Sequence, residues 1–243
     1  DLQLFARNHV TGVFQQDTPD IPHGEFSELS AWLHAKLLWN PGYDENAAID
    51  EFLAAYYGDA APQMRAYLDF IHDKAERENI HMICYEPPET KLLDGRYFAF
   101  ADSVWDEAER AVAGKPEYLE RVQASRLSPM YAHVARDVYD KAYAVDQASL
   151  TVNIDRDYMK RLDEFCAACE RFGVGYLNEG GTTPAQFRER IVAGITPVKL
   201  SLMPAKKTGG LKPVVAWKRY GAGWETTPLF ASAKPVGMGI SEQ

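Results

Sequence analysis

The stretch FSELSAWLHAKLLWNPGYDENAAIDEFLAAYYGDAAPQMRAYLDFI, residues 26–71, contains three successive helix patterns and decides the fold class. Its first pattern has two neighbouring apolar stripes at helical spacing, one of Phe26, Leu29, Leu33 and Leu37 and one of Trp32 and Trp39. A helix that is apolar over most of its circumference is usually buried. We therefore expect residues 26–39 to pack against other parts of the protein on two sides.

The two helices that follow are marked by their ends. Asp44 can cap the second helix, because its side chain can accept hydrogen bonds from first-turn N–H groups, and Gly58 can stop it. Asp59 can start the third helix, in which Pro62 is tolerated within the first turn. The third helix has an apolar face made of Met64, Tyr67, Leu68 and Ile71.

Helix signals continue as far as Gly194, so the sequence predicts a mainly α fold. The signals between residues 100 and 140 are a capping box at Ser103 and Asp106, a stop at Gly114, a start at Pro116 and a break that Pro129 causes near Ser128. Two more helices are expected, over residues 155–172 and from a capping box at residues 183–186 to Gly194.

The composition changes after Gly194. Residues 195–230 alternate apolar and polar side chains between glycine and proline breaks, which is typical of strands. This tail is basic and the helical body is acidic. We therefore expect the tail to fold back on the body, and we favour that interpretation over a ligand-binding patch because the apolar residues of the tail need burial.

The overall charge excludes some kinds of partner. The chain of 243 residues has a formal net charge of -9, whereas binding to nucleic acid or to an anionic membrane needs a basic surface. No apolar run approaches the ~20 residues of a membrane-spanning helix. We expect no nucleic acid and no membrane among the partners. The chain begins with DLQLFARNHV and has no initiator Met, so we expect that an upstream segment has been removed.

The cysteines predict a structural role. Cys166 and Cys169 form a CxxC pair inside a predicted helix, whereas a redox pair lies at a helix N-terminus, where the dipole lowers the pKa of a thiol. A zinc site needs two further ligands, and Cys84 offers no recognised spacing with His81 or His72. We expect Cys166 and Cys169 to be buried and reduced, without metal. The sequence also lacks the phosphate, dinucleotide and nucleophile motifs, so no cofactor is predicted.

The polar loop ahead of residue 26 holds the candidate site. Val10 to Phe14 reads as a short apolar strand, followed by Gln15, Gln16 and Asp17 and then by a loop with Asp20, His23 and Glu25. Two carboxylates could serve as acid and base in glycoside hydrolysis, but the sequence does not fix their separation. The favoured interpretation is that Asp20 and Glu25 are loop and helix-start acids, which the helix dipole stabilises.

Several of these segments resemble a known family. GVFQQ, residues 12–16, together with residues 26–71, resembles the end of the domain-of-unknown-function family 4838, whose members resemble glycoside hydrolases with an α-glucuronidase-like architecture. The resemblance continues through YLERVQASRLSPMY, residues 118–131, and FGVGYLNEGGTTPAQF, residues 172–187. Family members often have an acid near Gln15 or Gln16, so the amides here argue against a catalytic carboxylate on this strand.

The resemblance implies a (β/α)8 barrel followed by a helical C-terminal region. Residues 1–40 would be the last strand and helix of the barrel, residues 41–195 the helical domain and residues 196–243 a β-rich tail. The catalytic carboxylates would lie upstream, so we predict no catalytic residue in this chain and no hydrolysis by the chain alone. Residues past the C-terminal end of a barrel strand line the pocket. Gln15, Gln16, Asp17 and His23 are therefore the predicted substrate-binding residues.

Two functional interpretations stay open. In the first, the chain completes a glycoside hydrolase that acts on a carbohydrate, with uronic-acid-containing polysaccharide or oligosaccharide as the implied substrate. In the second, it is a non-catalytic helical module for interaction or scaffolding. Such a module would self-associate through residues 1–40, where a strand without neighbouring strands would leave an unpaired edge. A periplasmic or secreted location would suit polysaccharide chemistry, and the three cysteines favour no compartment.

Overall fold

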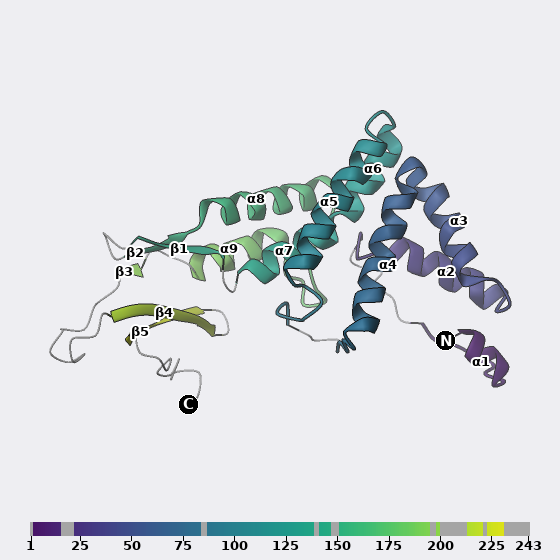
Figure 1. Ribbon diagram of the computed structural model, residues 1–243, viewed down its shortest axis with the longest axis horizontal. Coiled ribbons are helices and arrows are strands. Elements are labelled where there is room, and N and C mark those ends of the chain that lie inside the picture. The colour runs from purple at the N-terminus through teal and green to yellow at the C-terminus, as the bar shows by residue number, and fades with distance from the viewer. Residues whose placement is uncertain are drawn as a thin grey trace. The chain divides into compact units, whose positions relative to one another are not determined.

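The computed structural model describes residues 2–15, 22–83, 87–138, 141–146, 151–194, 198–199, 213–220 and 223–230 (Figure 1). The described chain is mainly helical, as the sequence predicts. It divides into two compact units, one of Asp1–His133 with Ala167–Thr182 and one of Val134–Cys166 with Thr183–Gln243. No helix within the described ranges combines the length and the hydropathy that a membrane span requires.

The first unit contains most of the helices. They are α1 (Leu2–Arg7), α2 (Ser27–Trp39), α3 (Glu45–Tyr57), the 3-10 turn η1 (Gly58–Ala60), α4 (Ala61–Arg77), α5 (Gly95–Ala111) and α6 (Pro116–Ser125). Two more helices, α7 (Leu127–Asp137) and α8 (Arg156–Arg171), have residues in both units.

The three helices predicted from residues 26–71 are confirmed as α2, α3 and α4. Asp44 caps α3, since its carboxylate accepts a hydrogen bond of 2.7 Å from the N–H of Ala47. Gly58 ends α3 with φ of 56°, a left-handed conformation that glycine adopts without a steric penalty. Pro62 lies in the first turn of α4, where the missing N–H would have no helical partner.

The core of the first unit is built mainly by α3, α4 and α5. Its largest fully buried side chains are Trp105, Tyr57, Tyr67, Leu53, Met64, Val112 and Val122. One side of α2 packs on this core through Phe26, which precedes the helix, and Leu29, both of which are buried. The other side is open, because Leu38 is 47% and Trp39 is 92% exposed. The prediction that this helix is buried on two sides is therefore wrong for the described residues.

Two predicted helix boundaries also need correction. Ser103 lies in the middle of α5, whose true cap is Asp94, with its carboxylate accepting hydrogen bonds from the N–H groups of Arg96 and Tyr97. The apolar side chains of α5 recur at helical spacing before and after Ser103, so the helix continues through that position. The break between α6 and α7 falls at Arg126, which places Pro129 in the first turn of α7, where proline is tolerated.

The predicted strand at Val10 to Phe14 is not formed. Residues 10–15 have no regular secondary structure, and Phe14 is 89% exposed. A single extended segment is not a strand until its N–H and C=O groups pair with a neighbouring strand. Within the described ranges no such neighbour lies beside residues 10–15.

The second unit contains the strands. An antiparallel sheet joins β1 (Tyr143–Asp146), β2 (Thr151–Ile154) and β3 (Val198–Lys199) in that order, and β4 (Pro213–Tyr220) forms an antiparallel hairpin with β5 (Gly223–Phe230). The strand prediction for the tail is thus confirmed at its described residues. The strands β1 and β2 are not predicted from the sequence.

The helix α9 (Pro184–Gly194) confirms the second predicted capping box. The Thr183 N–H donates to the Gln186 side chain at 3.0 Å, and the Gln186 N–H donates to the Thr183 hydroxyl at 3.1 Å. This reciprocal pair satisfies two donors that a helix start would otherwise leave without partners.

Candidate functional site

Only part of the predicted substrate-binding group can be placed. Gln15 is exposed at the end of the irregular segment 10–15. Gln16, Asp17 and Asp20 lie outside the described residues, and so does Cys84. His23 is the one other member of the predicted group that the described ranges include.

His23 is held at the entrance to α2. Its Nδ1 lies 3.2 Å from Oε1 of Glu28, within hydrogen-bond distance, and its ring meets the ring of Phe172 edge-on, with centroids 6.1 Å apart. His23 and Phe26 both have left-handed backbone conformations, with φ of 62° and 47°. Such conformations cost free energy in non-glycine residues, so the surrounding contacts must hold this short loop in place.

Glu25 provides one of those contacts. The hydroxyl of Tyr67 donates to the Glu25 carboxylate at 2.7 Å and lies 2.8 Å from the hydroxyl of Tyr97, which forms a three-residue hydrogen-bonded chain. Burial raises the pKa of the Glu25 carboxyl, and the hydrogen bond from Tyr67 and the nearby His72 oppose this shift. The acid predicted as a loop residue therefore anchors the loop to α4 and α5.

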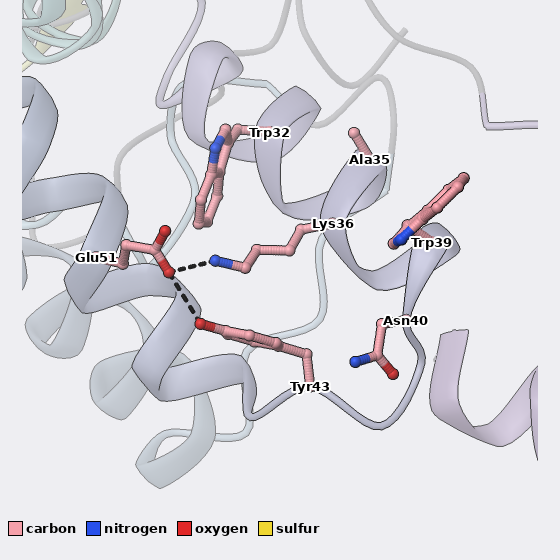
Figure 2. Close-up of a pocket in the computed structure, with 7 residues that line it drawn as sticks. All are labelled: Trp32, Ala35, Lys36, Trp39, Asn40, Tyr43 and Glu51. Carbon is pink, nitrogen blue, oxygen red and sulfur yellow. Dashed lines mark hydrogen bonds and ion pairs between the residues drawn. The ribbon is translucent and has the colours of Figure 1, made fainter.

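A pocket of about 490 Å³ lies on the exposed side of α2. Figure 2 shows the seven residues that line it: Trp32, Ala35, Lys36, Trp39, Asn40, Tyr43 and Glu51. Trp32, Lys36 and Trp39 share one face of the helix, because they are four and then three residues apart.

The turn after α2 completes the pocket. Asn40 accepts the N–H of Gly42 through its side-chain oxygen at 3.1 Å, and the Tyr43 N–H donates to the Asn40 carbonyl at 3.0 Å. Such Asn-led turns reverse the chain within a few residues. The turn therefore brings Tyr43 back beside the last turn of α2.

Lys36 is enclosed by aromatic and acidic groups. Its ammonium lies 4.4 Å from the ring centroid of Trp32 and 4.1 Å from that of Tyr43, both within cation–π range. It also donates to Oε2 of Glu51, and the Tyr43 hydroxyl donates to the same oxygen at 2.9 Å. These contacts fix the positions of Lys36, Tyr43 and Glu51 relative to one another.

The protonation states of this pair follow from the same contacts. Burial alone would lower the pKa of Lys36, but its hydrogen bonds with Glu51 and Tyr43 raise that pKa above its ordinary value. Hydrogen bonds from Lys36 and Tyr43 lower the pKa of Glu51. Both side chains are therefore charged at neutral pH, and the pair contributes no net charge to the pocket.

Trp39 differs from the other aromatic residues of the pocket. The Trp32 ring packs on Phe52, with centroids 5.7 Å apart, whereas Trp39 is 92% exposed. A large indole in solvent adds no stability through burial, and its ring is free to contact a ligand that enters the pocket. The helical spacing predicts that Trp39 packs against other parts of the protein, and its position directly before the Asn-Pro-Gly turn is the signal that indicates exposure.

The chemistry of the pocket suits binding rather than a reaction. Glu51 is the single carboxylate among the described lining residues, and the hydrolysis of a glycosidic bond uses two. In the described part of the chain, no three His, Cys, Asp or Glu side chains gather in a way that could hold a metal ion.

Cys169 is buried, as predicted, while Cys166 is only half-buried, with its thiol 3.5 Å from the carbonyl of Pro184.

The geometry defines a helical unit with an open, aromatic-lined binding pocket. Residues 1–69 match the family model described as Domain of unknown function (DUF4838), so this segment is similar to that family. The matched segment includes every residue that lines the pocket. No curated protein and no solved structure matches the chain.

Proposed function

We propose that the chain is the C-terminal portion of a carbohydrate-active protein and that its first 69 residues border the substrate pocket. The observation that carries the proposal is the exposed indole of Trp39, which lines one pocket together with the polar groups of Asn40 and Glu51. A pyranose ring has an apolar C–H face and a rim of hydroxyls. An aromatic platform with a few polar groups at its edge matches both features.

The resemblance to α-glucuronidase-like glycoside hydrolases suggests the reaction, which is the hydrolysis of a glycosidic bond in a polysaccharide or oligosaccharide. In this proposal residues 1–40 form the end of a (β/α)8 barrel, residues 41–195 a helical domain and residues 196–243 a tail. The catalytic carboxylates lie on other strands, and the present chain supports the barrel and contacts substrate.

The exposed apolar residues near the start of the chain support this arrangement. They are Leu4, Phe5, Val10, Val13, Phe14 and Leu38. A barrel wall would cover these side chains and give Val10 to Phe14 the neighbouring strand that it lacks. The same surface would then leave the Trp39 pocket at the border between barrel and helices.

Affinity electrophoresis tests the proposal. The chain is run in native gels that contain a series of soluble plant and bacterial polysaccharides, with Trp39→Ala and Leu38→Ala as matched variants. We expect retardation of the wild type and of Leu38→Ala by at least one polysaccharide, and free migration of Trp39→Ala. Equal migration of all three proteins in every gel would contradict the proposal.

A second candidate is a helical interaction module, and the exposed apolar side chains of residues 4–14 favour it. In that case the chain self-associates through residues 1–40 without binding sugar. Sedimentation velocity separates the two candidates. A concentration-dependent dimer that becomes a monomer when residues 1–24 are deleted, together with no retardation by polysaccharide, would favour the interaction module.

A further inference from the structure

We infer that the Trp39 pocket binds a neutral sugar residue and that Glu51 makes it reject a uronic acid. This inference rests on the proposed carbohydrate function and specifies which residue of the carbohydrate occupies the pocket. It concerns this pocket alone, so a uronic acid elsewhere in the substrate is compatible with it.

The argument begins with the charges that face the pocket. Lys36 is the single cation among the described residues that line it, and Glu51 is the single anion. The ammonium of Lys36 is already hydrogen-bonded to Glu51 and lies over the rings of Trp32 and Tyr43. No lining cation is therefore left to pair with the carboxylate of a ligand.

A uronate would also meet repulsion. To reach Lys36, the ligand carboxylate would have to approach the Glu51 carboxylate or displace it from both Lys36 and Tyr43. Like charges a few ångströms apart repel each other. A ligand without charge avoids both costs.

The remaining polar groups suit hydroxyls. Glu51 uses only Oε2 for Lys36 and Tyr43, so Oε1 has lone pairs for a ligand hydroxyl. Asn40 accepts the Gly42 N–H with its oxygen, and its NH2 group has two donors to offer. Figure 2 shows Trp39 and Asn40 on one side of the pocket and the Lys36–Glu51 pair with Tyr43 on the other. A sugar ring stacked on Trp39 would direct its hydroxyls toward Asn40 and toward the Lys36–Glu51 pair.

Titration calorimetry with matched ligands tests the inference. The probes are tetrasaccharides of glucose, mannose, galactose and xylose, and the corresponding tetrasaccharides of glucuronic, mannuronic and galacturonic acid. We expect the wild type to bind at least one neutral tetrasaccharide at least tenfold more tightly than its uronic counterpart, and Trp39→Ala to lose that binding.

Glu51→Gln tests the assigned role of the carboxylate. Gln keeps an oxygen that can accept from Lys36 and Tyr43 but removes the negative charge, so Lys36 becomes available to a uronate. We expect a gain of at least tenfold in uronate affinity and, with it, a fall of at least tenfold in the ratio of neutral-sugar to uronate affinity. Glu45→Gln, an exposed acid of α3 away from the pocket lining, is the matched control and should change neither.

The outcomes are distinguishable. A wild type that prefers the uronic ligands would overturn the inference and leave the carbohydrate function standing. Absence of binding to every probe would overturn both. A Glu51→Gln variant that folds as the wild type does but gains no uronate affinity would show that Glu51 does not cause the rejection of uronates.

Discussion

Replacing Tyr67 by Phe should destabilise the first unit, because the hydroxyl of Tyr67 holds the loop before α2 to the helical core. The Tyr67 side chain is fully buried, and its hydroxyl contacts the Glu25 carboxylate at 2.7 Å and the Tyr97 hydroxyl at 2.8 Å. Phe preserves the ring and its contact with Trp105, so the change removes the hydroxyl and little else.

The size of the effect follows from the two lost contacts. A hydrogen bond to a charged group contributes about 1.5–3 kcal/mol, and we take the lower end for Glu25 because the burial of its carboxylate offsets part of the gain. Leaving the hydroxyl of buried Tyr97 without its partner costs about 1–3 kcal/mol. Together the loss in the free energy of unfolding should be about 3 kcal/mol.

Urea unfolding, followed by tryptophan fluorescence, measures this loss. Tyr118→Phe is the matched control, because the Tyr118 ring packs on the same core and its hydroxyl has no hydrogen bond among the described residues. The control should change the free energy of unfolding by less than about 0.5 kcal/mol. Equal midpoints for Tyr67→Phe and Tyr118→Phe would refute the reasoning.

Three further predictions concern titratable groups. Burial raises the pKa of Glu25 above 4.5. The contribution of this side chain to the free energy of unfolding is therefore present below pH 4.5 and is lost as the pH rises through the folded-state pKa. Glu25→Gln should therefore unfold at higher urea than the wild type at pH 7, and the two should coincide at pH 4; a variant weaker at pH 7 would contradict this. Burial alone would raise the pKa of the Asp94 carboxyl, but hydrogen bonds from Tyr97 and Lys74 lower it to about 2. The stabilisation by Asp94 is thus present above 3.8 and lost as the pH falls toward 2, so Asp94→Asn should weaken the protein at pH 7 but not at pH 2. Native alkylation should be slower for the buried Cys169 than for the half-buried Cys166, whose thiol pKa is raised by burial; equally fast labelling in the native state and in denaturant would show both thiols to be exposed.

The helices could be predicted where local signals and periodicity agree. Asp44, Gly58 and the capping box at residues 183–186 act within a few residues of their own position, so the sequence alone locates them. The prediction for the start of α5 is wrong because Ser103 has the spacing of a cap but lies within an apolar periodicity that begins earlier in the chain. The short strands β1 and β2 depend on pairing between segments, which no single-segment pattern reports.

The pocket could not be predicted for a different reason. The sequence shows that Trp32 and Trp39 share one side of a helix, but it does not show which of them another element covers. Phe52 of α3 packs on Trp32, while Trp39 is exposed to solvent. The bond that joins Lys36 to Glu51 spans 15 residues and depends on the packing of α2 on α3.

Nuclear magnetic resonance of the tryptophan side chains tests the central claim most directly. The chain contains five tryptophans, so its indole N–H signals can be assigned by single substitutions and followed as the neutral tetrasaccharides are added. We predict that the Trp39 signal shifts most and the Trp32 signal less, while the signal of buried Trp105 stays in place. No shift at Trp39 with any neutral sugar, or a larger shift at Trp105, would contradict the assignment of this pocket to carbohydrate.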